Sequence, residues 1–159
     1  MNQAQEIRGL QGPYRFLSNF HSARVTMYGV EFPTNEHAYQ AAKMPQRDLL
    51  RTQEEWLKDL KAFAQIETAK KAKRAGRTLR MRDDWDEVKY GIMLELTRRK
   101  YVRHPLLAGK LLNTGTAYIW ELNDWDDTYW GVIEEGGKLI GENNLGKILM
   151  QVRKELNGD

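Results

Sequence analysis

Apolar residues recur at helical spacing through most of this chain, and this pattern restricts its possible folds more than any other feature. The C-terminal stripe consists of Leu145, Ile148, Leu149, Val152 and Leu156. A second stripe lies in residues 85–101, which we expect to form one long helix that Trp85 opens and that ends before Pro105. Most of the chain is therefore expected to be helical.

Alternating apolar and polar residues, the pattern of a half-buried strand, occur in residues 23–32. The two halves flank Tyr28 and Gly29, and glycine there can adopt the positive φ of a tight hairpin turn. Residues 118–122 are a candidate for one more short strand. With 159 residues, the chain has the length of one domain. We expect a single domain over residues 1–159, mainly α-helical, with a small β-hairpin near the N-terminus.

Capping residues and helix breakers predict several helix ends. Residues 52–55, Thr-Gln-Glu-Glu, have the pattern of a capping box and open a helical segment. Residues 66–75 are expected to continue as helix, with Gly76 ending it in the left-handed conformation. Pro105 is expected to start a shorter helix that runs to Leu112.

The absence of cysteine excludes disulfides and thiolate metal sites. The three histidines, His21, His37 and His104, do not have metal-ligand spacing. The first residues contain no apolar segment of a secretion signal, and no apolar run is long enough to span a bilayer. We therefore expect a cytoplasmic protein that needs no metal, no cofactor and no membrane.

Charge is distributed unevenly within the net charge of +3. Residues 61–103 contain 13 basic and 6 acidic side chains, whereas residues 104–159 contain 5 basic and 9 acidic ones. A basic block of this kind suits a phosphate-bearing ligand or a nucleic acid. Alternatively, part of it is the solvated face of a helix, formed by Lys70, Lys71, Lys73 and Arg74.

Residues 34–43, Thr-Asn-Glu-His-Ala-Tyr-Gln-Ala-Ala-Lys, have the pattern of a capped helix with a carboxylate in its first turn. Thr34 is a candidate N-cap, and the helix dipole favours the ionised form of Glu36 at the second helical position. Gln40 and Lys43 follow Glu36 at spacings that place all three on one face. This face is a candidate ligand site, although a carboxylate that complements the dipole of a surface helix has the same pattern.

Two further segments contain polar side chains that suit a ligand. In residues 16–20, Phe16 and two other apolar residues surround Ser18 and Asn19, which can hold a ligand or satisfy a local turn. Residues 77–84 contain three arginines, which can bind phosphate bidentately or form ion pairs with the aspartates that follow them.

Residues 123–131 contain two tryptophans and three aspartates, an unusual composition for a connecting loop. Aromatic rings beside carboxylates suit a nucleobase stacked on a ring and a cationic or hydroxylated group held by an acid. A hydrophobic plug within a solvated acidic loop has the same composition. Asn143 is expected to cap the C-terminal helix, whose first amides form a candidate anion site, and Gly146 permits close approach there.

Six motifs occur in order over residues 14–156. They are Phe16-Leu17-Ser18-Asn19-Phe20, Thr34-x-Glu36-His37-Ala38-Tyr39-Gln40-Ala41-x-Lys43, Gly76-Arg77, Arg82-x-x-Trp85, Asp127-x-x-Trp130-Gly131 and Gly141-x-Asn143-x-Leu145-Gly146-x-x-Leu149-Met150-x-x-Arg153. Together they resemble the NADAR (YbiA-like) N-glycosidase family. The resemblance implies a mainly α-helical fold and cleavage of N-glycosidic bonds in ribose-phosphate compounds. These compounds are either riboflavin-pathway intermediates or ADP-ribose attached to a base such as guanine.

The resemblance also implies which residues form the active site. The expected catalytic residues are Glu36, Trp85, Asp127 and Trp130. The residues expected to bind substrate are Phe16, Ser18, Asn19, Gln40, Lys43, Arg77, Arg82, Gly131 and Asn143. The sequence departs from the family pattern at Asn35 and at the bulky acidic residues 124–126, which affects the expected substrate size and not the chemistry.

Cleavage of a ribosyl C–N bond develops positive charge on the sugar, which an ionised carboxylate stabilises more in the transition state than in the ground state. Glu36 and Asp127 are the two candidates for this role. One would face the sugar or activate water, while the other assists the leaving base or orients a ribose hydroxyl. Trp85 and Trp130 are expected to stack on the base or line the pocket. The three cations of the binding set and the amides near Asn143 are expected to bind phosphate.

The expected partner is a phosphorylated ribose-containing small molecule or an ADP-ribosylated nucleobase, free or within a nucleic acid, with no obligate protein partner. Two alternatives stay open. One is a catalytically silent module that binds ADP-ribose or another NAD derivative, although such a module needs no anion at the sugar. The other is a basic helical protein that binds nucleic acid with an affinity that falls steeply as salt is added.

Overall fold

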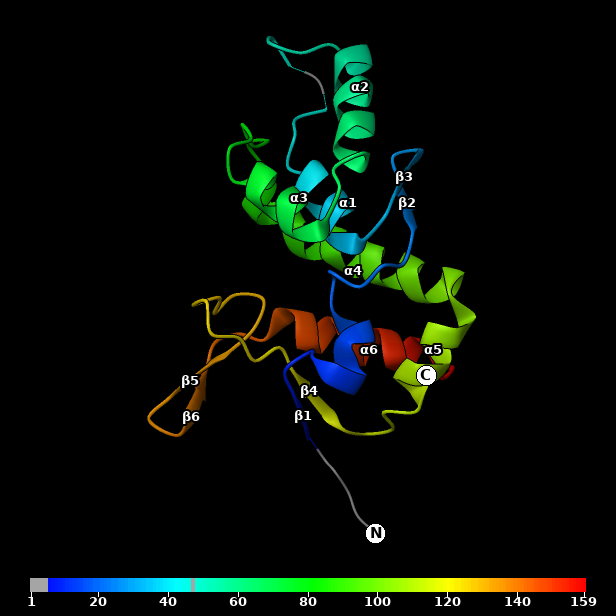
Figure 1. The fold of residues 1–159 in the computed structure, drawn as a ribbon, viewed down its shortest axis with the longest axis vertical. Coiled ribbons are helices and arrows are strands. Elements are labelled where there is room, and N and C mark those ends of the chain that lie inside the picture. The colour runs from blue at the N-terminus through cyan, green and yellow to red at the C-terminus, as the bar shows by residue number, and fades with distance from the viewer. Residues whose placement is uncertain (1–5, 47) are drawn as a thin grey trace. The chain divides into compact units, whose positions relative to one another are not determined.

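The structure is a computed structural model that describes residues 6–46 and 48–159. The chain divides into two compact units. One unit consists of residues 19–103, and the other combines the first 18 residues with residues 104–159. Each unit has its own helices and strands (Figure 1). Each also has its own buried residues.

The fold is mixed α/β, so the expectation of a mainly α-helical fold is wrong. Besides the expected hairpin, β1 (Glu6–Arg8) pairs in parallel with β4 (Tyr118–Trp120), the strand expected within residues 118–122. In addition, β5 (Ile133–Glu135) pairs antiparallel with β6 (Lys138–Ile140). Each of these strands has 3 residues, which is too short to show the alternation on which strand prediction depends.

In residues 19–103, a hairpin precedes a group of helices (Figure 1). β2 (Val25–Met27) pairs antiparallel with β3 (Val30–Phe32), and Tyr28 (φ 55) and Gly29 (φ 76) occupy the turn. The predicted hairpin is therefore confirmed. The helices are α1 (Asn35–Ala41), α2 (Gln53–Ala64), α3 (Ala69–Gly76) and α4 (Trp85–Arg103).

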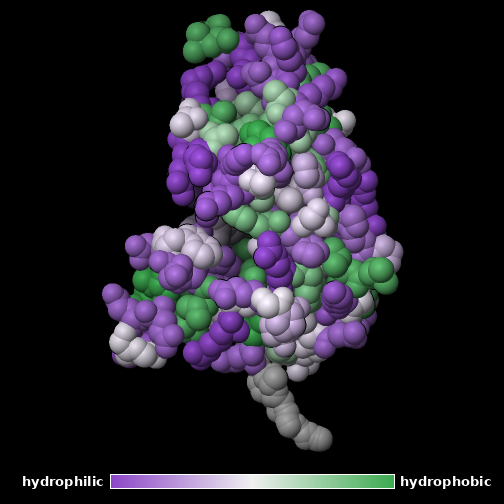
Figure 2. All heavy atoms as spheres, viewed as in Figure 1, coloured by the Kyte–Doolittle hydropathy of each residue, from purple (hydrophilic) through white to green (hydrophobic). Residues whose placement is uncertain are grey.

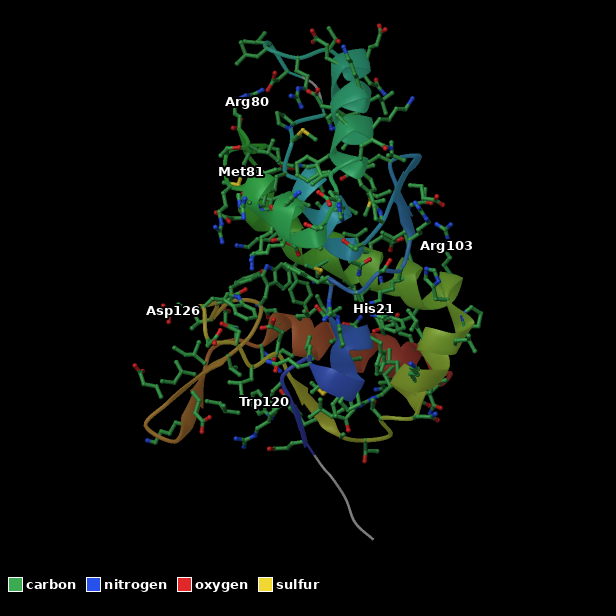
Figure 3. All side chains as sticks on the ribbon, viewed as in Figure 1. His21, Arg80, Met81, Arg103, Trp120 and Asp126 are labelled. Atoms are coloured by element: carbon green, nitrogen blue, oxygen red, sulfur yellow. The ribbon has the colours of Figure 1, made fainter. Side chains whose placement is uncertain are left out.

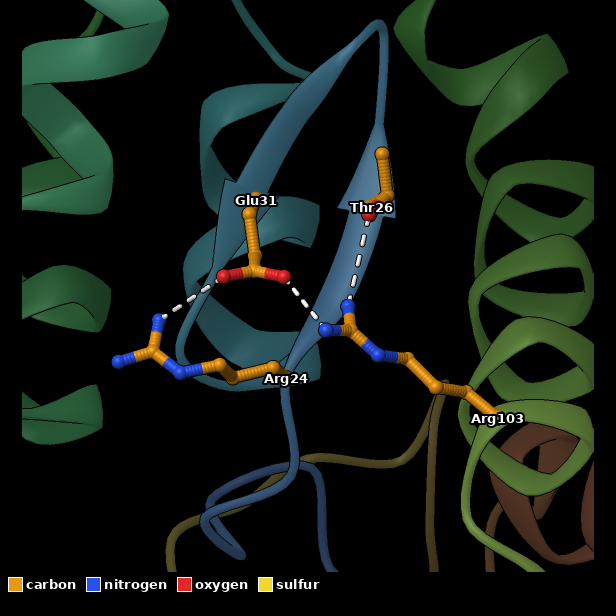
Figure 4. Close-up of polar contacts among 4 residues, drawn as sticks. All are labelled: Arg24, Thr26, Glu31 and Arg103. Carbon is orange, nitrogen blue, oxygen red and sulfur yellow. Dashed lines mark hydrogen bonds and ion pairs between the residues drawn. The ribbon is translucent and has the colours of Figure 1, made fainter.

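Two arginines contact the exposed face of the hairpin (Figure 4). Arg103, the last residue of α4, pairs with the carboxylate of Glu31 and donates to Oγ1 of Thr26 at 3.5 Å. Arg24 pairs with the other carboxylate oxygen of Glu31, also at 3.5 Å. The hydrogen bond from Arg103 is the main reason why the pKa of Glu31 is lowered. The pair of Arg103 and Glu31 connects α4 to the hairpin. Because the side chains of both pairs are exposed, the pairs add little stability.

The helix ends agree with the sequence at α2 and differ from it at α3. In the predicted capping box, Oγ1 of Thr52 accepts from the amide of Glu55 at 3.1 Å, and the Glu55 carboxylate accepts from the Thr52 amide at 2.8 Å. Residues 69–75 are helical as expected, but the continuation from the preceding helix is wrong, because α2 ends at Ala64 and Thr68 is the N-cap of a separate helix, α3. The Thr68 hydroxyl accepts from an amide in the first turn of α3, which defines a new helix start.

Gly76 is the last residue of α3 and does not have the left-handed conformation predicted for it. Arg77 follows as a right-handed cap, with φ of −70. A Cβ atom at Gly76 would lie 1.9 Å from Oε1 of Gln40 on α1. Glycine is therefore required at this position by the close packing of α3 on α1. It is not required to end the helix.

The second unit contains α6 (Asn144–Leu156), and both α5 (Pro105–Leu112) and β4 pack against it. A 3₁₀ helix, η1 (Gly12–Leu17), belongs to the same unit. Helices α5 and α6 confirm the two helices predicted in this part of the chain. The buried apolar residues of this unit include Leu17, Leu111, Ile119, Ile148 and Leu149.

Asn143 is the N-cap residue of α6, as predicted, but its side chain makes no capping hydrogen bond. It has the left-handed conformation, with φ of 53 and ψ of 40. Its Nδ2 donates to the carbonyl of Ile119 at 2.9 Å, and its Oδ1 accepts from the amide of Glu121 at 2.9 Å. A Cβ at Gly146 would lie 2.2 Å from the same carbonyl of Ile119, which confirms the close approach expected there.

The visible surface around α2 is mainly hydrophilic (Figure 2). Leu49 and Leu50, in the turn that precedes this helix, are exposed exceptions. None of the helices within residues 6–46 and 48–159 is long and apolar enough to cross a membrane.

Candidate active site

The carboxylate of Glu36 is buried at the start of α1. Thr34 caps this helix as predicted, because its Oγ1 accepts from the backbone amide of His37 at 3.1 Å. Glu36 is 6% exposed, and its Oε1 accepts a hydrogen bond from Nε2 of Gln40 at 2.8 Å. Every residue of α1 is buried. Glu36 is therefore not an exposed carboxylate on a surface helix, which was the alternative interpretation of this segment.

Asn19 holds the first turn of α1 from outside the helix. Its backbone carbonyl accepts from the amide of Glu36 at 3.1 Å, and its Oδ1 accepts from Nδ2 of Asn35 at 3.3 Å. Its Nδ2 points to the sulfur of Met93, 3.3 Å away on α4. Asn19 thus positions the backbone of Glu36 and does more than satisfy a local turn.

Two aromatic rings connect the end of α1 to α4. The Nζ atom of Lys43 lies 5.9 Å from the ring centroid of Tyr39, within the range of a cation–π contact. Tyr39 in turn contacts Trp85, with ring centroids 5.1 Å apart. Burial lowers the pKa of the Lys43 ammonium, an effect that the negative charge of Glu36 opposes. The unit thus brings Glu36, Gln40, Lys43 and Trp85 together around α1.

Positive charge surrounds Lys43. Burial is the largest cause that lowers the pKa of Lys43, and the positive charges of Lys73, Arg77 and Lys89 lower it further. Arg77 is exposed and forms no ion pair with any residue that the structure describes. Its guanidinium is therefore available to an anion such as a phosphate.

Arg80 and Arg82 both form ion pairs, but only Arg82 has a partner that the alternative interpretation of their segment proposed. Arg82 contacts Asp84 through Nε at 2.6 Å and through its terminal nitrogen at 3.0 Å, and the hydrogen bond to Asp84 is the main cause that raises its pKa. Its backbone amide donates to the carbonyl of Lys43 at 2.7 Å. Arg80, which is labelled in Figure 3, pairs with Asp48 at 2.6 Å and not with an aspartate of its own segment. A role of Arg82 in phosphate binding stays a prediction.

In the second unit, Asp127 organises the loop of residues 123–131. Its Oδ1 accepts from the backbone amides of Tyr129 at 3.1 Å and Trp130 at 2.8 Å. Its Oδ2 accepts no hydrogen bond from any described residue. One carboxylate oxygen thus fixes the position of Trp130, and the other is available to a ligand. Asp126, in the left-handed conformation with φ of 64, lies at the outer edge of this loop (Figure 3).

Sequence reasoning did not identify Asn123, which closes this loop. The residue is 6% exposed, and its side chain bonds to both backbone groups of Asp127. Its Nδ2 also lies 3.1 Å from the carboxylate of Glu121. The signal was present in the sequence, because an asparagine at the start of a loop often bonds to backbone groups a few residues later.

The first amides of α6 already have acceptors. The amides of residues 142–145 donate to carbonyls of residues 128–131, at distances of 2.8 to 3.2 Å. A Cβ at Gly131 would lie 2.1 Å from the carbonyl oxygen of Glu121, the residue that follows β4. Glycine at this position therefore allows the loop to pass close to the end of β4. Asp127, Trp130, Gly131 and Asn143 are thereby joined in one assembly. The hypothesis that amides near Asn143 bind phosphate gains no support from this geometry.

Phe16 and Ser18 lie in and after η1. Phe16 is buried, and Nζ of Lys110 lies 5.7 Å from its ring centroid. The amide of Ser18 donates to the carbonyl of Arg15 at 2.9 Å. These contacts are those of a core residue and a local turn, and a role of Phe16 or Ser18 in binding substrate stays a prediction.

The predicted site residues divide between the two units. Residues 19–103 contain Asn19, Glu36, Gln40, Lys43, Arg77, Arg82 and Trp85. The other unit contains Phe16, Ser18, Asp127, Trp130, Gly131 and Asn143. Among the residues that the structure describes, no three acidic or histidine side chains are grouped closely enough to hold a metal ion.

Several known proteins have sequences similar to that of this chain. N-glycosidase YbiA of Escherichia coli (strain K12) is 31% identical over 143 residues, which cover 90% of this chain and 82% of the relative. An N-glycosidase of Nostoc punctiforme is 34% identical over 149 residues, covering 91% and 86%. A riboflavin biosynthesis protein of Vibrio vulnificus is 36% identical over 143 residues, covering 89% of this chain. The match spans only 35% of that longer protein.

The fold is also similar to a solved structure, the NMR structure of the E. coli protein YbiA. The TM-score is 0.77 at 30% sequence identity, and the match covers 99% of this chain and 88% of the other. The sequence model of the NADAR domain matches residues 7–157, a range that includes most of both units. From these matches, the chain belongs to the NADAR domain family.

Proposed function

We propose that this protein is a hydrolase that cleaves the ribosyl C–N bond of a phosphorylated riboside. Two of its relatives are named N-glycosidases, which agrees with the enzyme class expected from the sequence. The observation that carries the proposal is the buried carboxylate of Glu36, held by Gln40 at 2.8 Å. An anion fixed before the reaction stabilises a developing cation without reorganisation, which is an effective form of catalysis.

The proposed reaction begins when the bond between the ribose carbon and the base nitrogen breaks. The electron pair leaves with the nitrogen, and the positive charge on the ribose is stabilised by Glu36. A water oxygen then forms a bond to the ribose carbon, the water loses a proton, and the leaving base gains one. The products are the free base and a phosphorylated sugar with a new hydroxyl group.

Asp127 is assigned the second carboxylate role, which is to orient a ribose hydroxyl or to take the proton from water. Its Oδ1 is held by two backbone amides, so its position is fixed relative to Trp130. Trp85 and Trp130 are each proposed to stack on the base. Each ring is held by another aromatic ring, Tyr129 at 4.8 Å and Tyr39 at 5.1 Å.

The phosphates of the substrate are assigned to the basic side chains around α1. Lys43 and Arg77 are the preferred residues because Arg82 is paired with Asp84. Two classes of substrate contain both a ribosyl C–N bond and a phosphate for these side chains to bind. They are ADP-ribose attached to guanine and phosphoribosyl intermediates of the riboflavin pathway. The name of the Vibrio vulnificus relative favours the second class. Charged phosphorylated ribosides are retained inside cells, so a cytoplasmic location is part of the proposal.

The test is to incubate the purified protein separately with ADP-ribosylated guanine nucleotide and with phosphoribosyl-aminopyrimidine intermediates. Released bases and sugars are identified by mass spectrometry, with Glu36→Gln as the control. We expect release from at least one substrate by the natural protein and much less by the variant. Binding of either compound without release would instead identify a non-catalytic binding module.

A further inference from the structure

Gly76, at the end of α3, lies against the side chain of Gln40 on α1. A Cβ atom at Gly76 would be 1.9 Å from Oε1, 2.6 Å from Cδ and 3.1 Å from Cβ of Gln40. The first two distances are shorter than real Cβ atoms adopt, so any larger residue must displace the Gln40 amide. Only glycine leaves room for this side chain as it stands.

The two ends of the Gln40 amide have different surroundings. Its Nε2 donates to Oε1 of Glu36 at 2.8 Å. Its own Oε1 is buried and accepts no hydrogen bond within the described part of the chain. Burying an amide oxygen without a donor costs free energy, so the packing around Gln40 must maintain this orientation. A flipped amide would place its oxygen against the carboxylate of Glu36, which is repulsive.

We propose that Gly76 is a positioning residue of the active site, acting through Gln40 on Glu36. By leaving space for the Gln40 amide, Gly76 keeps Nε2 directed at the carboxylate. Gln40 is 5% exposed, so its amide cannot turn outward into solvent to relieve a clash. This inference rests on the proposed function, in which Glu36 stabilises the charge on the ribose.

The expected consequence of Gly76→Ala is loss of the hydrogen bond between Gln40 and Glu36. The carboxylate then loses the contact from Gln40 that helps to fix its position, and a displacement of about 1 Å in a catalytic group costs up to about 10²-fold in rate. We expect kcat to fall roughly 10- to 100-fold, with a smaller change in KM, because the ground-state contacts to phosphate are retained.

A double-mutant cycle tests the route through Gln40. Gln40→Ala removes the Oε1 and Cδ atoms, the two nearest atoms that a Cβ at Gly76 would meet, and of the three nearest atoms it leaves the Cβ of residue 40 at 3.1 Å. We therefore expect Gly76→Ala to lower kcat strongly in the natural sequence and to change it by less than about 2-fold in the Gln40→Ala background. Gly91→Ala is the matched control, because a Cβ at this helical glycine of α4 meets nothing within 4 Å.

Each outcome decides the question. Additive effects of the two substitutions, or full turnover by Gly76→Ala, would overturn the positioning role. If Gly76→Ala does not fold, the double variant decides: a folded protein with the kcat of Gln40→Ala supports the role, and a lower kcat overturns it. Glu36→Gln is measured in parallel. No turnover by the natural protein would refute the proposed function, and natural turnover in Glu36→Gln would move the main catalytic role to Asp127. Loss of turnover in Glu36→Gln together with a normal Gly76→Ala would refute only the positioning role.

Discussion

The side chain of Asn123 bonds to the backbone of Asp127 in both directions. Its Oδ1 accepts from the Asp127 amide at 3.0 Å, and its Nδ2 donates to the Asp127 carbonyl at 2.9 Å. One buried amide therefore closes the loop whose carboxylate fixes Trp130. Asp127 depends on this anchor for its position, because the loop contains no helix or strand of its own.

Replacement of Asn123 by alanine is expected to lower both stability and turnover. The part-buried backbone groups of Asp127 would lose their partners, which costs about 1–3 kcal/mol of unfolding free energy. Displacement of Asp127 should also lower kcat. Urea unfolding and steady-state kinetics measure the two effects. Asp124→Ala, an exposed position in the same loop, should change stability by less than about 0.5 kcal/mol, and equal effects would contradict the anchor.

Arg77→Ala is expected to raise KM more than it lowers kcat. Its guanidinium has no ion-pair partner in the described residues, so it is free to bind substrate phosphate in the ground state and the transition state alike. Arg80→Ala is the control, since Arg80 pairs with Asp48. A collapse of kcat at unchanged KM would mean that Arg77 acts in the chemical step.

The parts of the fold that sequence predicts well are those set by neighbouring residues. Thr34 and Thr52 cap the helices expected of them, because a threonine hydroxyl and the amides of the following turn lie within one segment. The parallel pair β1–β4 was not predictable, because it joins Ile7 to Ile119 across most of the chain. The hairpin β5–β6 had a usable signal in Gly136 and Gly137, which both adopt positive φ in its turn.

The same distinction applies to the candidate site. The spacing of Glu36 and Gln40 predicted a shared helix face, and the two side chains are hydrogen-bonded. The amides at the start of α6 had the local pattern of an anion site, but carbonyls from residues 128–131 occupy them. Gly76 had the pattern of a helix terminator, whereas its contact with Gln40 comes from a different helix. Local patterns locate donors and acceptors but do not show which partners distant segments supply.

His37 is expected to make stability fall in weakly acidic solution. Its Nε2 lies 2.9 Å from the carbonyl of Ile66 and its Nδ1 lies 2.7 Å from Oγ1 of Thr34. Since a carbonyl only accepts, we assign the proton of the neutral ring to Nε2. Burial lowers the pKa of His37 from the ordinary value of 6.5, although the bond to Ile66 opposes this. The contribution of neutral His37 is therefore complete above pH 6.5 and is lost as pH falls through the folded-state pKa.

Urea unfolding at a series of pH values from above 6.5 to about 5 measures this dependence. The variant His37→Gln, which retains a donor but does not titrate, should show a flatter pH dependence. A natural protein whose unfolding free energy does not change over this range would contradict the assignment.

Glu36→Gln is expected to abolish most of the turnover while leaving binding and folding nearly intact. Glutamine keeps the shape of the side chain and an oxygen that can accept from Gln40, but it removes the negative charge that stabilises the ribosyl cation. We expect kcat to fall roughly 10² to 10⁴-fold, the usual effect of losing one acid–base or electrostatic group. The loss of a favourable helix-dipole interaction should cost only about 0.3–1 kcal/mol of stability.

Glu54 provides a matched control for this variant, because it occupies the second position of α2 just as Glu36 occupies the second position of α1. Glu54 is exposed, so Glu54→Gln removes the same charge from the same helical position without reaching a buried site. Thermal unfolding, substrate affinity and single-turnover rate should be measured on both variants. A similar small loss of stability in both, with turnover lost only in Glu36→Gln, separates catalysis from the helix dipole. Near-normal turnover in Glu36→Gln would transfer the main catalytic role to Asp127, the carboxylate that holds Trp130.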